Sequence, residues 1–183
     1  MRIIGGAARG RQLKTPVGQD IRPTSDKVRL AIFNALFSRG GIVDAVVMDV
    51  FCGTGALGLE ALSQGAQTAY FFDMSRESLS LAKENAAALG FSGQSHFAQK
   101  DATKLGVKPA ANLPATHIFL DPPYCKNLIH PTVEALKSGN WLAEDAIIII
   151  ETEKEAAPIE GFGTITFDKT YGETRVIFLH ISH

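Results

Sequence analysis

The stretch DVFCGTGALG, residues 49–58, decides the fold of this chain. An apolar run of strand length precedes it, and helix-forming residues follow it to residue 62. Strand, glycine loop and helix in this order present backbone N–H groups and a helix N-terminus to a ligand. Gly53, Gly55 and Gly58 form a G-x-G-x-x-G pattern, and Asp73 follows 20 residues after Gly53, where a carboxylate that binds ribose hydroxyls is expected. The stretch predicts a nucleoside-containing cofactor; the alternative is that the glycines serve only the turn.

The acid that opens this stretch separates two kinds of cofactor. A dinucleotide places its pyrophosphate at the helix N-terminus and usually needs a second mononucleotide-binding half. The anionic side chain of Asp49 is poorly placed beside a pyrophosphate, whereas it suits the ammonium and sulfonium groups of S-adenosylmethionine. This charge argument favours S-adenosylmethionine over NAD.

Length and composition bound the remaining possibilities. With 183 residues, 45% hydrophobic and 20% charged, the chain is expected to form an ordinary soluble globular protein with one core. No apolar run approaches the roughly 20 residues of a membrane helix, and the first residues lack a signal-peptide stretch. The two cysteines and five histidines lack metal-ligand spacing. We therefore expect a cytoplasmic protein with reduced cysteines and no metal.

Charge divides the chain into two parts. Residues 1–40 contain eight Lys and Arg residues against two Asp, a net charge of +6, which leaves −7 for residues 41–183. Basic side chains gathered at one end favour contact with a polyanion, because neutralised phosphates release counterions. The alternative is a solvated basic arm without a partner. We predict a basic N-terminal extension, residues 1–40, and a main domain, residues 41–183.

The order of elements predicts an α/β fold. In the extension we expect a hairpin of residues 2–6 and 10–14, then a helix capped by Thr24 or Ser25 that runs to about residue 38. Strands are expected at 45–50, 68–72, 95–98, 116–120 and 146–150, with helices at 57–64, 75–89 and 128–137. Alternating strands and helices favour a doubly wound, mainly parallel sheet. Residues 164–167 and 175–181 are expected to add an antiparallel C-terminal strand pair.

A second motif, Asp121-Pro122-Pro123-Tyr124, follows the strand at 116–120. Ligands of doubly wound sheets bind outside the carboxyl ends of the strands, so this turn is expected beside the glycine loop. A carboxylate, a carbonyl acceptor and a flat ring suit an exocyclic amino group on a stacked base. The plainer alternative is a strand that ends in a rigid turn with a partly buried tyrosine.

These motifs resemble those of the S-adenosylmethionine-dependent amino-group methyltransferases, marked by D-x-F-x-G-x-G followed by (N/D)-P-P-(Y/F). The whole chain is similar to the RsmD family in its stretches RIIGG (2–6), RGR (9–11), RPT (22–24), DVF (49–51), GALGLEA (55–61) and YG (171–172). Departures are minor: Cys52 and Thr54 replace the common Ala and Ser, and Leu30 stands where the family often has Glu.

The resemblance implies a Rossmann-like class I methyltransferase fold and an activity. Members methylate the N2 amine of one guanine in 16S ribosomal RNA of the bacterial small subunit, with S-adenosylmethionine as cofactor. The implied partner is this RNA within the subunit or a late assembly intermediate, and the implied protein is a metal-free monomer. Methyl transfer is implied to be direct and in line, without a covalent enzyme intermediate, to a base splayed out of its stack.

The resemblance also assigns roles by position. The implied catalytic residues are Asp121, Pro122, Pro123 and Tyr124. The implied cofactor-binding residues are Asp49, Phe51, Cys52, Gly53, Thr54, Gly55, Asp73, Met74, Asp101, Ala102, Arg22 and Thr24. The candidates for contact with RNA phosphates are Arg2, Arg9, Arg11, Lys14, Lys27 and Arg29.

Four rival functions account for part of the pattern. A DNA adenine or cytosine methyltransferase usually adds a sizeable target-recognition segment, and a protein-glutamine methyltransferase typically carries Asn at the position of Asp121. An NAD-linked dehydrogenase explains the glycines and Asp73 but not the second motif. A non-catalytic RNA-binding protein explains the basic extension but not the cofactor loop.

Overall fold

The computed structural model of the chain describes residues 1–18 and 25–182. Seven strands form one sheet in the order β3-β2-β1-β4-β5-β7-β6. The first five strands in this order are parallel, whereas β7 is antiparallel to both β5 and β6. The strands are β1 (Val46–Asp49), β2 (Thr68–Asp73), β3 (Ser95–Gln99), β4 (Ala115–Leu120), β5 (Leu142–Glu153), β6 (Thr164–Tyr171) and β7 (Thr174–His180). The predicted mainly parallel sheet with an antiparallel C-terminal pair is confirmed.

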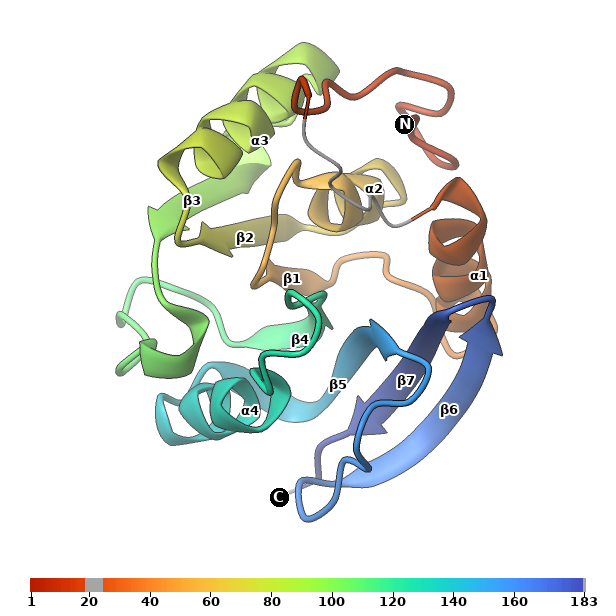
Figure 1. Cartoon of the computed structure of the whole chain (residues 1–183). Coiled ribbons are helices and arrows are strands. Elements are labelled where there is room, and N and C mark those ends of the chain that lie inside the picture. The colour runs from red at the N-terminus through yellow and green to blue at the C-terminus, as the bar shows by residue number, and fades with distance from the viewer. Residues whose placement is uncertain (19–24, 183) are drawn as a thin grey trace.

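Helices cover both faces of the sheet (Figure 1). One face packs against α1 (Asp26–Phe37), α2 (Ala56–Ser63) and α3 (Arg76–Leu89). The other face packs against α4 (Ile129–Ser138) and the short 3-10 helix η2 (Ala102–Lys104). A second 3-10 turn, η1 (Ser92–Gln94), precedes β3. Such a two-sided sheet leaves the carboxyl edge of the parallel strands open between the layers, where ligands of this fold bind.

The helix of the extension begins where its capping residue predicts. Ser25 is the N-cap of α1, and its side chain accepts a hydrogen bond from the backbone N–H of Val28 at 3.2 Å. The apolar face that includes Ile32 and Leu36 is buried as expected. Phe37, which we expected beside that face, is 83% exposed at the last position of the helix.

The expected hairpin is reduced to a single antiparallel bridge between Arg2 and Gln12. The segment is instead fastened to the main domain by buried side chains. Ile3, Ala8 and Leu13 lie in the same hydrophobic core as α1, α2 and α3. Backbone hydrogen bonds from Ile3 N to Arg11 O at 2.9 Å and from Leu13 N to Met1 O at 3.0 Å accompany the bridge. Core burial and these hydrogen bonds together hold the segment in place. We call residues 1–16 the arm.

Strand β5 is longer than its apolar run predicts. It begins at Leu142 and continues through Glu144 and Asp145, and its pairing with β4 is irregular between Ala115 and His117. Polar residues in this part carry no apolar signal, so the sequence indicated only residues 146–150.

Among the described residues, no helix combines the length and the apolar character that crossing a bilayer requires.

Candidate active site

The glycine loop joins β1 to α2 in the geometry that its sequence predicts. Gly55 is the N-cap of α2 and has a φ of 80°, a left-handed conformation that favours glycine. Gly58 lies in the first turn of α2, where an added Cβ would come within 2.3 Å of Cε1 of Phe71 on β2. The glycines therefore turn the chain and allow α2 to approach the sheet closely, which points the helix N-terminus at the carboxyl edge.

Two acids hold the loop in place. Asp49, at the end of β1, accepts a hydrogen bond from the backbone N–H of Gly58 at 3.0 Å through Oδ2. Asp73, at the end of β2, accepts from Gly53 N at 3.0 Å through Oδ2 and from Ser75 N at 2.8 Å through Oδ1. Both carboxylates therefore order the backbone around the predicted cofactor position.

Asp49 lies in an environment that disfavours its negative charge. Burial raises the pKa of this carboxyl to about 7, against the lowering effect of the hydrogen bond from Gly58. The negative charges of Asp121 and Asp73 raise the pKa of Asp49 further. A cation bound here would relieve this repulsion.

The remaining loop residues differ in exposure. Cys52 is buried, and burial raises the pKa of its thiol well above the usual range, so it is no nucleophile at neutral pH. Phe51 and Thr54 are half-buried, whereas Met74 is 66% exposed. The side chain of Thr54 contacts Met1 of the arm through Oγ1 and Sδ, 3.7 Å apart.

The loop after β3 supplies the next predicted contacts. Asp101 caps η2: its Oδ1 accepts from the N–H of Thr103 at 2.9 Å and from its hydroxyl at 2.7 Å. These hydrogen bonds lower the pKa of Asp101 and keep it anionic. Ala102 is buried behind it. Parallel strands end at one edge, so this loop lies on the same side of the sheet as the glycine loop.

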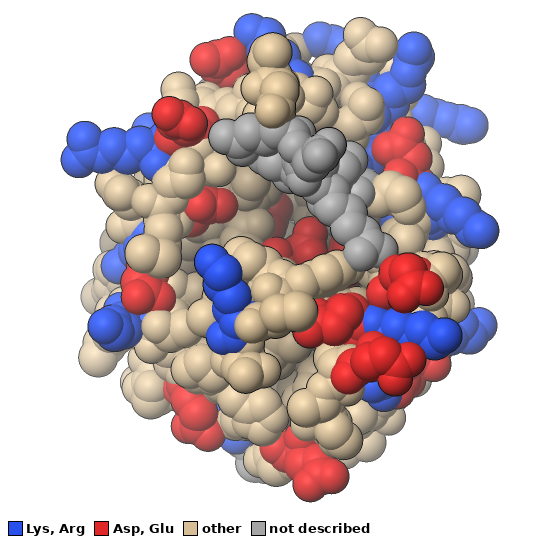
Figure 2. All heavy atoms as spheres, viewed as in Figure 1, with Lys and Arg blue, Asp and Glu red and all other residues tan. Residues whose placement is uncertain are grey.

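The second motif follows β4, the strand beside β1, with Asp49 in register with Phe119. Asp121 is half-exposed, Pro122 is buried and Pro123 is exposed. The hydroxyl of the half-buried Tyr124 lies 3.5 Å from Oγ1 of Thr174 on β7. Figure 2 shows a hollow near the middle of this face of the molecule, with acidic atoms at its floor.

Glu151 is an acid of this region that the sequence patterns did not indicate. It follows Ile150, which pairs in register with Leu120, so Glu151 continues β5 beside Asp121. The side chain is 4% exposed. Its position directly after the isoleucine run was a usable signal, because an acid at the carboxyl end of a central parallel strand faces the ligand edge.

The structure corrects one candidate for RNA contact. Arg29 is fully buried, and its Nε lies 3.4 Å from Oε2 of the equally buried Glu60 of α2. Its Nη2 donates to Oδ1 of Asp26 at 2.9 Å and to the backbone carbonyl of Arg2. Helical periodicity placed Arg29 opposite the apolar face, but a buried acid on a neighbouring helix draws it inward. Its role is therefore structural.

The other candidates for RNA contact are exposed: Arg2, Arg9, Arg11, Lys14 and Lys27. Arg11 donates to the carbonyl of Ala88 at 2.6 Å, and Lys14 pairs with Glu84 at 3.0 Å on the surface of α3. Arg22 and Thr24, predicted to border the cofactor or target pocket, lie outside the described residues.

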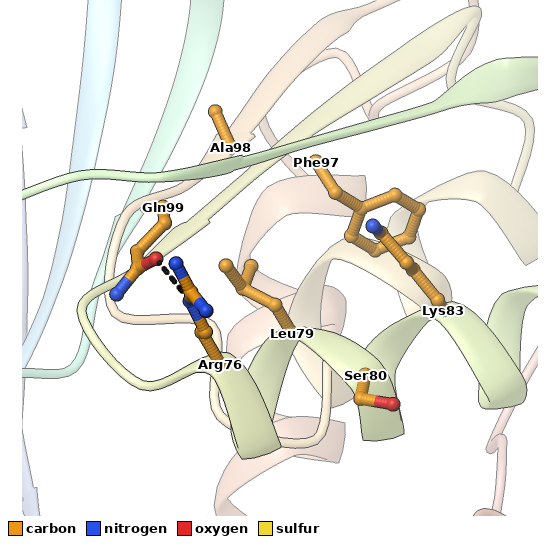
Figure 3. Close-up of a pocket in the computed structure, with 7 residues that line it drawn as sticks. All are labelled: Arg76, Leu79, Ser80, Lys83, Phe97, Ala98 and Gln99. Carbon is orange, nitrogen blue, oxygen red and sulfur yellow. Dashed lines mark hydrogen bonds between the residues drawn. The ribbon is translucent and has the colours of Figure 1, made fainter.

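A separate open depression of about 360 Å³ lies between α3 and the edge strand β3 (Figure 3). Arg76 Nε donates to Gln99 Oε1 at 3.1 Å, and Gln99 Nε2 donates to the carbonyl of Met74 at 2.8 Å. Lys83 lies over the ring of Phe97, 5.8 Å from its centroid. This depression is not the predicted site, but Gln99 at its rim fixes the loop that carries Asp73.

No cluster of three potential metal ligands occurs among residues 1–18 and 25–182.

A doubly wound sheet with a glycine loop, an acid at the end of β1 and an Asp-Pro-Pro-Tyr turn after β4 defines a class: this protein is a methyltransferase with a Rossmann-like class I fold. Comparison with known proteins identifies the family. The model of the family described as "Conserved hypothetical protein 95" matches residues 1–180. The chain belongs to this family, which includes the RsmD ribosomal RNA methyltransferases.

Three relatives illustrate the similarity. "Ribosomal RNA small subunit methyltransferase D" of Escherichia coli K12 is 39% identical over 85% of this chain and 76% of its own length. "Putative rRNA methyltransferase YlbH" of Bacillus subtilis is 33% identical over 96% of each chain. The solved structure of "Putative methyltransferase yhhF from Escherichia coli" aligns with a TM-score of 0.84 and 34% identity, covering 100% of this chain and 98% of the other.

Proposed function

We propose that this protein transfers a methyl group from S-adenosylmethionine to the exocyclic N2 amine of a guanine in 16S ribosomal RNA. The products are N2-methylguanine and S-adenosylhomocysteine. The observation that carries this proposal is the position of the Asp121–Tyr124 turn: it follows β4, which pairs in parallel with β1, so it lies at the same sheet edge as the glycine loop that follows β1.

The residues around the glycine loop fit S-adenosylmethionine. Asp49 is buried and disfavoured as an anion, so the ammonium of the cofactor would offset the cost of its charge. The position of a Cβ on Gly53 is open space, with nothing within 4 Å, which leaves room for a ligand at the turn. Asp73 and Asp101 would hold the ribose hydroxyls and the adenine amine, respectively. When bound, the cofactor supplies an activated methyl group.

The Asp121–Tyr124 turn would orient the acceptor. The guanine amine is a weak nucleophile because its lone pair is delocalised into the ring. Asp121 and the carbonyl of Pro122 would accept its hydrogens, hold the nitrogen in line and stabilise the positive charge that develops on it. Tyr124 would stack on the base. The proton leaves to water or to Asp121, and Cys52, buried with a raised thiol pKa, takes no part.

The extension of residues 1–40 is proposed to contact RNA. Exposed cations of the arm and of the start of α1, namely Arg2, Arg9, Arg11, Lys14 and Lys27, would neutralise phosphates. The names of two relatives, which refer to rRNA, support this class of substrate. We propose that the substrate is the RNA within the small subunit or a late assembly intermediate, because the small arm offers little surface for recognising free RNA. Such a substrate implies a cytoplasmic reaction.

Methyl transfer from labelled S-adenosylmethionine tests the proposal directly. The substrates are small ribosomal subunits that lack native methylation, the same RNA freed of protein, duplex DNA and a protein fraction. Nucleosides are then identified by mass spectrometry. Label recovered as N2-methylguanine from the subunits supports the proposal. Label in DNA or protein instead, or none anywhere despite cofactor binding, contradicts the proposed substrate.

A further inference from the structure

A buried asparagine of α3 joins the arm to the glycine loop. Asn85 is 1% exposed. Its Oδ1 accepts a hydrogen bond from the backbone N–H of Lys14 at 2.8 Å, and its Nδ2 donates to the carbonyl of Lys14 at 3.1 Å. The same Nδ2 donates to the carbonyl of Thr54 at 3.0 Å. One amide therefore uses both N–H groups and its oxygen on two segments that are 40 residues apart in sequence.

The two segments belong to different parts of the proposed function. Thr54 lies between Gly53 and Gly55, in the turn that we assign to the cofactor. Lys14 belongs to the arm, which we assign to RNA. The helix packs closely behind the turn, since a Cβ on Gly55 would lie 3.2 Å from the Cβ of Ala82. Asn85 is therefore held by a rigid element and cannot follow one segment without disturbing the other.

Displacement of either segment would leave polar atoms without partners inside the protein. A shift of the turn would remove the acceptor of one Nδ2 hydrogen, and a shift of the arm would break the pair of bonds to Lys14. Unsatisfied groups at a site with 1% exposure are costly because water cannot replace the missing partner. The contact between Thr54 Oγ1 and Met1 Sδ adds a direct link between the same two segments.

We propose that Asn85 is a positioning residue that couples the glycine loop to the arm, so that cofactor and RNA strengthen each other's binding. The inference rests on the proposed function for its two ligands. A ligand that orders the turn fixes the carbonyl of Thr54, which accepts from Asn85. Asn85 in turn holds the arm through Lys14. The arm then has less conformational entropy to lose when RNA binds. Linkage requires that RNA raise cofactor affinity by the same factor.

A matched pair of variants isolates the coupling from the anchoring of the arm. Asn85→Asp keeps the shape and the acceptor for Lys14 N but loses both donated hydrogen bonds. Ser63→Ala is the control: the buried Oγ of Ser63 donates to Gly5 O at 2.6 Å and accepts from Ala8 N at 2.9 Å. Ser63 therefore anchors the arm equally from α2 without bonding to the turn.

The first measurement is affinity for unmethylated small subunits with and without saturating S-adenosylhomocysteine. In the wild type we expect the cofactor product to tighten binding about 5-fold or more, the usual lower range of allosteric coupling. Asn85→Asp should bring this ratio close to one and raise KM for subunits with little change in kcat. Ser63→Ala should weaken binding in both states and keep the ratio. A preserved ratio in Asn85→Asp, or its equal loss in Ser63→Ala, overturns the inference.

The second measurement needs no RNA, and its main outcome is read from the wild type. Hydrogen exchange of the Lys14 amide, which donates to Asn85, is followed with and without S-adenosylhomocysteine. We expect slower exchange when the cofactor product is bound to the wild type, and the same rate with and without it in Asn85→Asp. Bound product that leaves the exchange of wild-type Lys14 unchanged overturns the coupling, whatever the substrate of methyl transfer proves to be.

Discussion

At the scale of single residues, Asp49 links stability to pH. Its pKa is raised from 3.8 to about 7 on folding, so the folded state holds this proton more tightly than the unfolded state. The stabilisation from the protonated form is complete below the unfolded pKa and is lost as pH rises through the folded pKa. At 1.36 kcal/mol per pKa unit, the loss between pH 4 and pH 8 is roughly 4 kcal/mol at most. An asparagine at this position does not ionise, so the variant Asp49→Asn should not lose stability in this way.

Urea unfolding of the cofactor-free protein and of Asp49→Asn at pH 5 and pH 8 checks this expectation. The variant should gain stability relative to the wild type as pH rises, because it keeps an acceptor for Gly58 N and never acquires the charge. The affinity for S-adenosylmethionine should increase from pH 6 to pH 8 in the wild type, because Asp49 becomes anionic. It should not increase in Asp49→Asn. A stability difference that is the same at both pH values would contradict a perturbed Asp49.

Asp121 and Tyr124 are expected to act on the acceptor rather than on the cofactor. Asp121→Ala should lower kcat by about 10²-fold or more, the usual cost of losing a group that stabilises developing charge. Cofactor affinity, measured by calorimetry, should change little.

Tyr124→Phe should lower methyl-transfer activity only mildly and Tyr124→Ala severely, because stacking needs the ring and not the hydroxyl. Equal damage from both Tyr124 variants would assign the role to the hydroxyl near Thr174.

At the scale of elements, the buried ion pair between α1 and α2 also anchors the arm. Glu60 accepts from the N–H of Ile4 at 2.9 Å and of Gly5 at 2.8 Å, in addition to its contact with Arg29. Glu60→Gln should cost about 3–5 kcal/mol of unfolding free energy, since it leaves the Arg29 charge buried with weaker compensation. Arg29→Met combined with Glu60→Gln should cost less than the sum of the single changes. Additive costs in urea unfolding would show that the pair is not coupled.

Elements that are encoded locally were the ones that the sequence could predict. The glycine loop needs a strand, a turn and a helix within a few residues, and the Ser25 cap needs only its own first turn. Arg29 and Asn85 were missed or misplaced because their partners, Glu60 and the pair Lys14 and Thr54, are remote in sequence and meet only after folding. The one sequence signal for such buried contacts was a polar residue at a helix position that faces the core.

At the scale of the whole molecule, the fold brings opposite charges into one arrangement. The acids Asp49, Asp73 and Asp121 end or follow the neighbouring parallel strands β1, β2 and β4 at the carboxyl edge of the sheet. The exposed cations of the extension lie on α1 and on the arm against α2 and α3. Figure 2 shows a hollow with acidic atoms at its floor, and most basic side chains of this face at its outer edge. Acids in the pocket suit a cationic cofactor and an amine, while the surrounding cations suit the phosphates of the RNA that carries it.

The salt dependence of RNA binding reports on this arrangement. Replacing both Arg9 and Arg11 by Gln should weaken binding to small subunits and reduce the slope of log affinity against log salt by about 0.7–0.9 for each phosphate that is no longer neutralised. The control replaces Lys137 of α4, on the opposite face of the sheet, and Lys169 of the edge strand β6, both exposed cations, by Gln. Both double variants change the net charge equally, so only a local contact can separate them. Equal salt slopes in the two double variants would mean that total charge, and not the arm, governs RNA binding. The arm would then have no specific role in RNA contact, and the assignment of the methyl-transfer site would be unaffected.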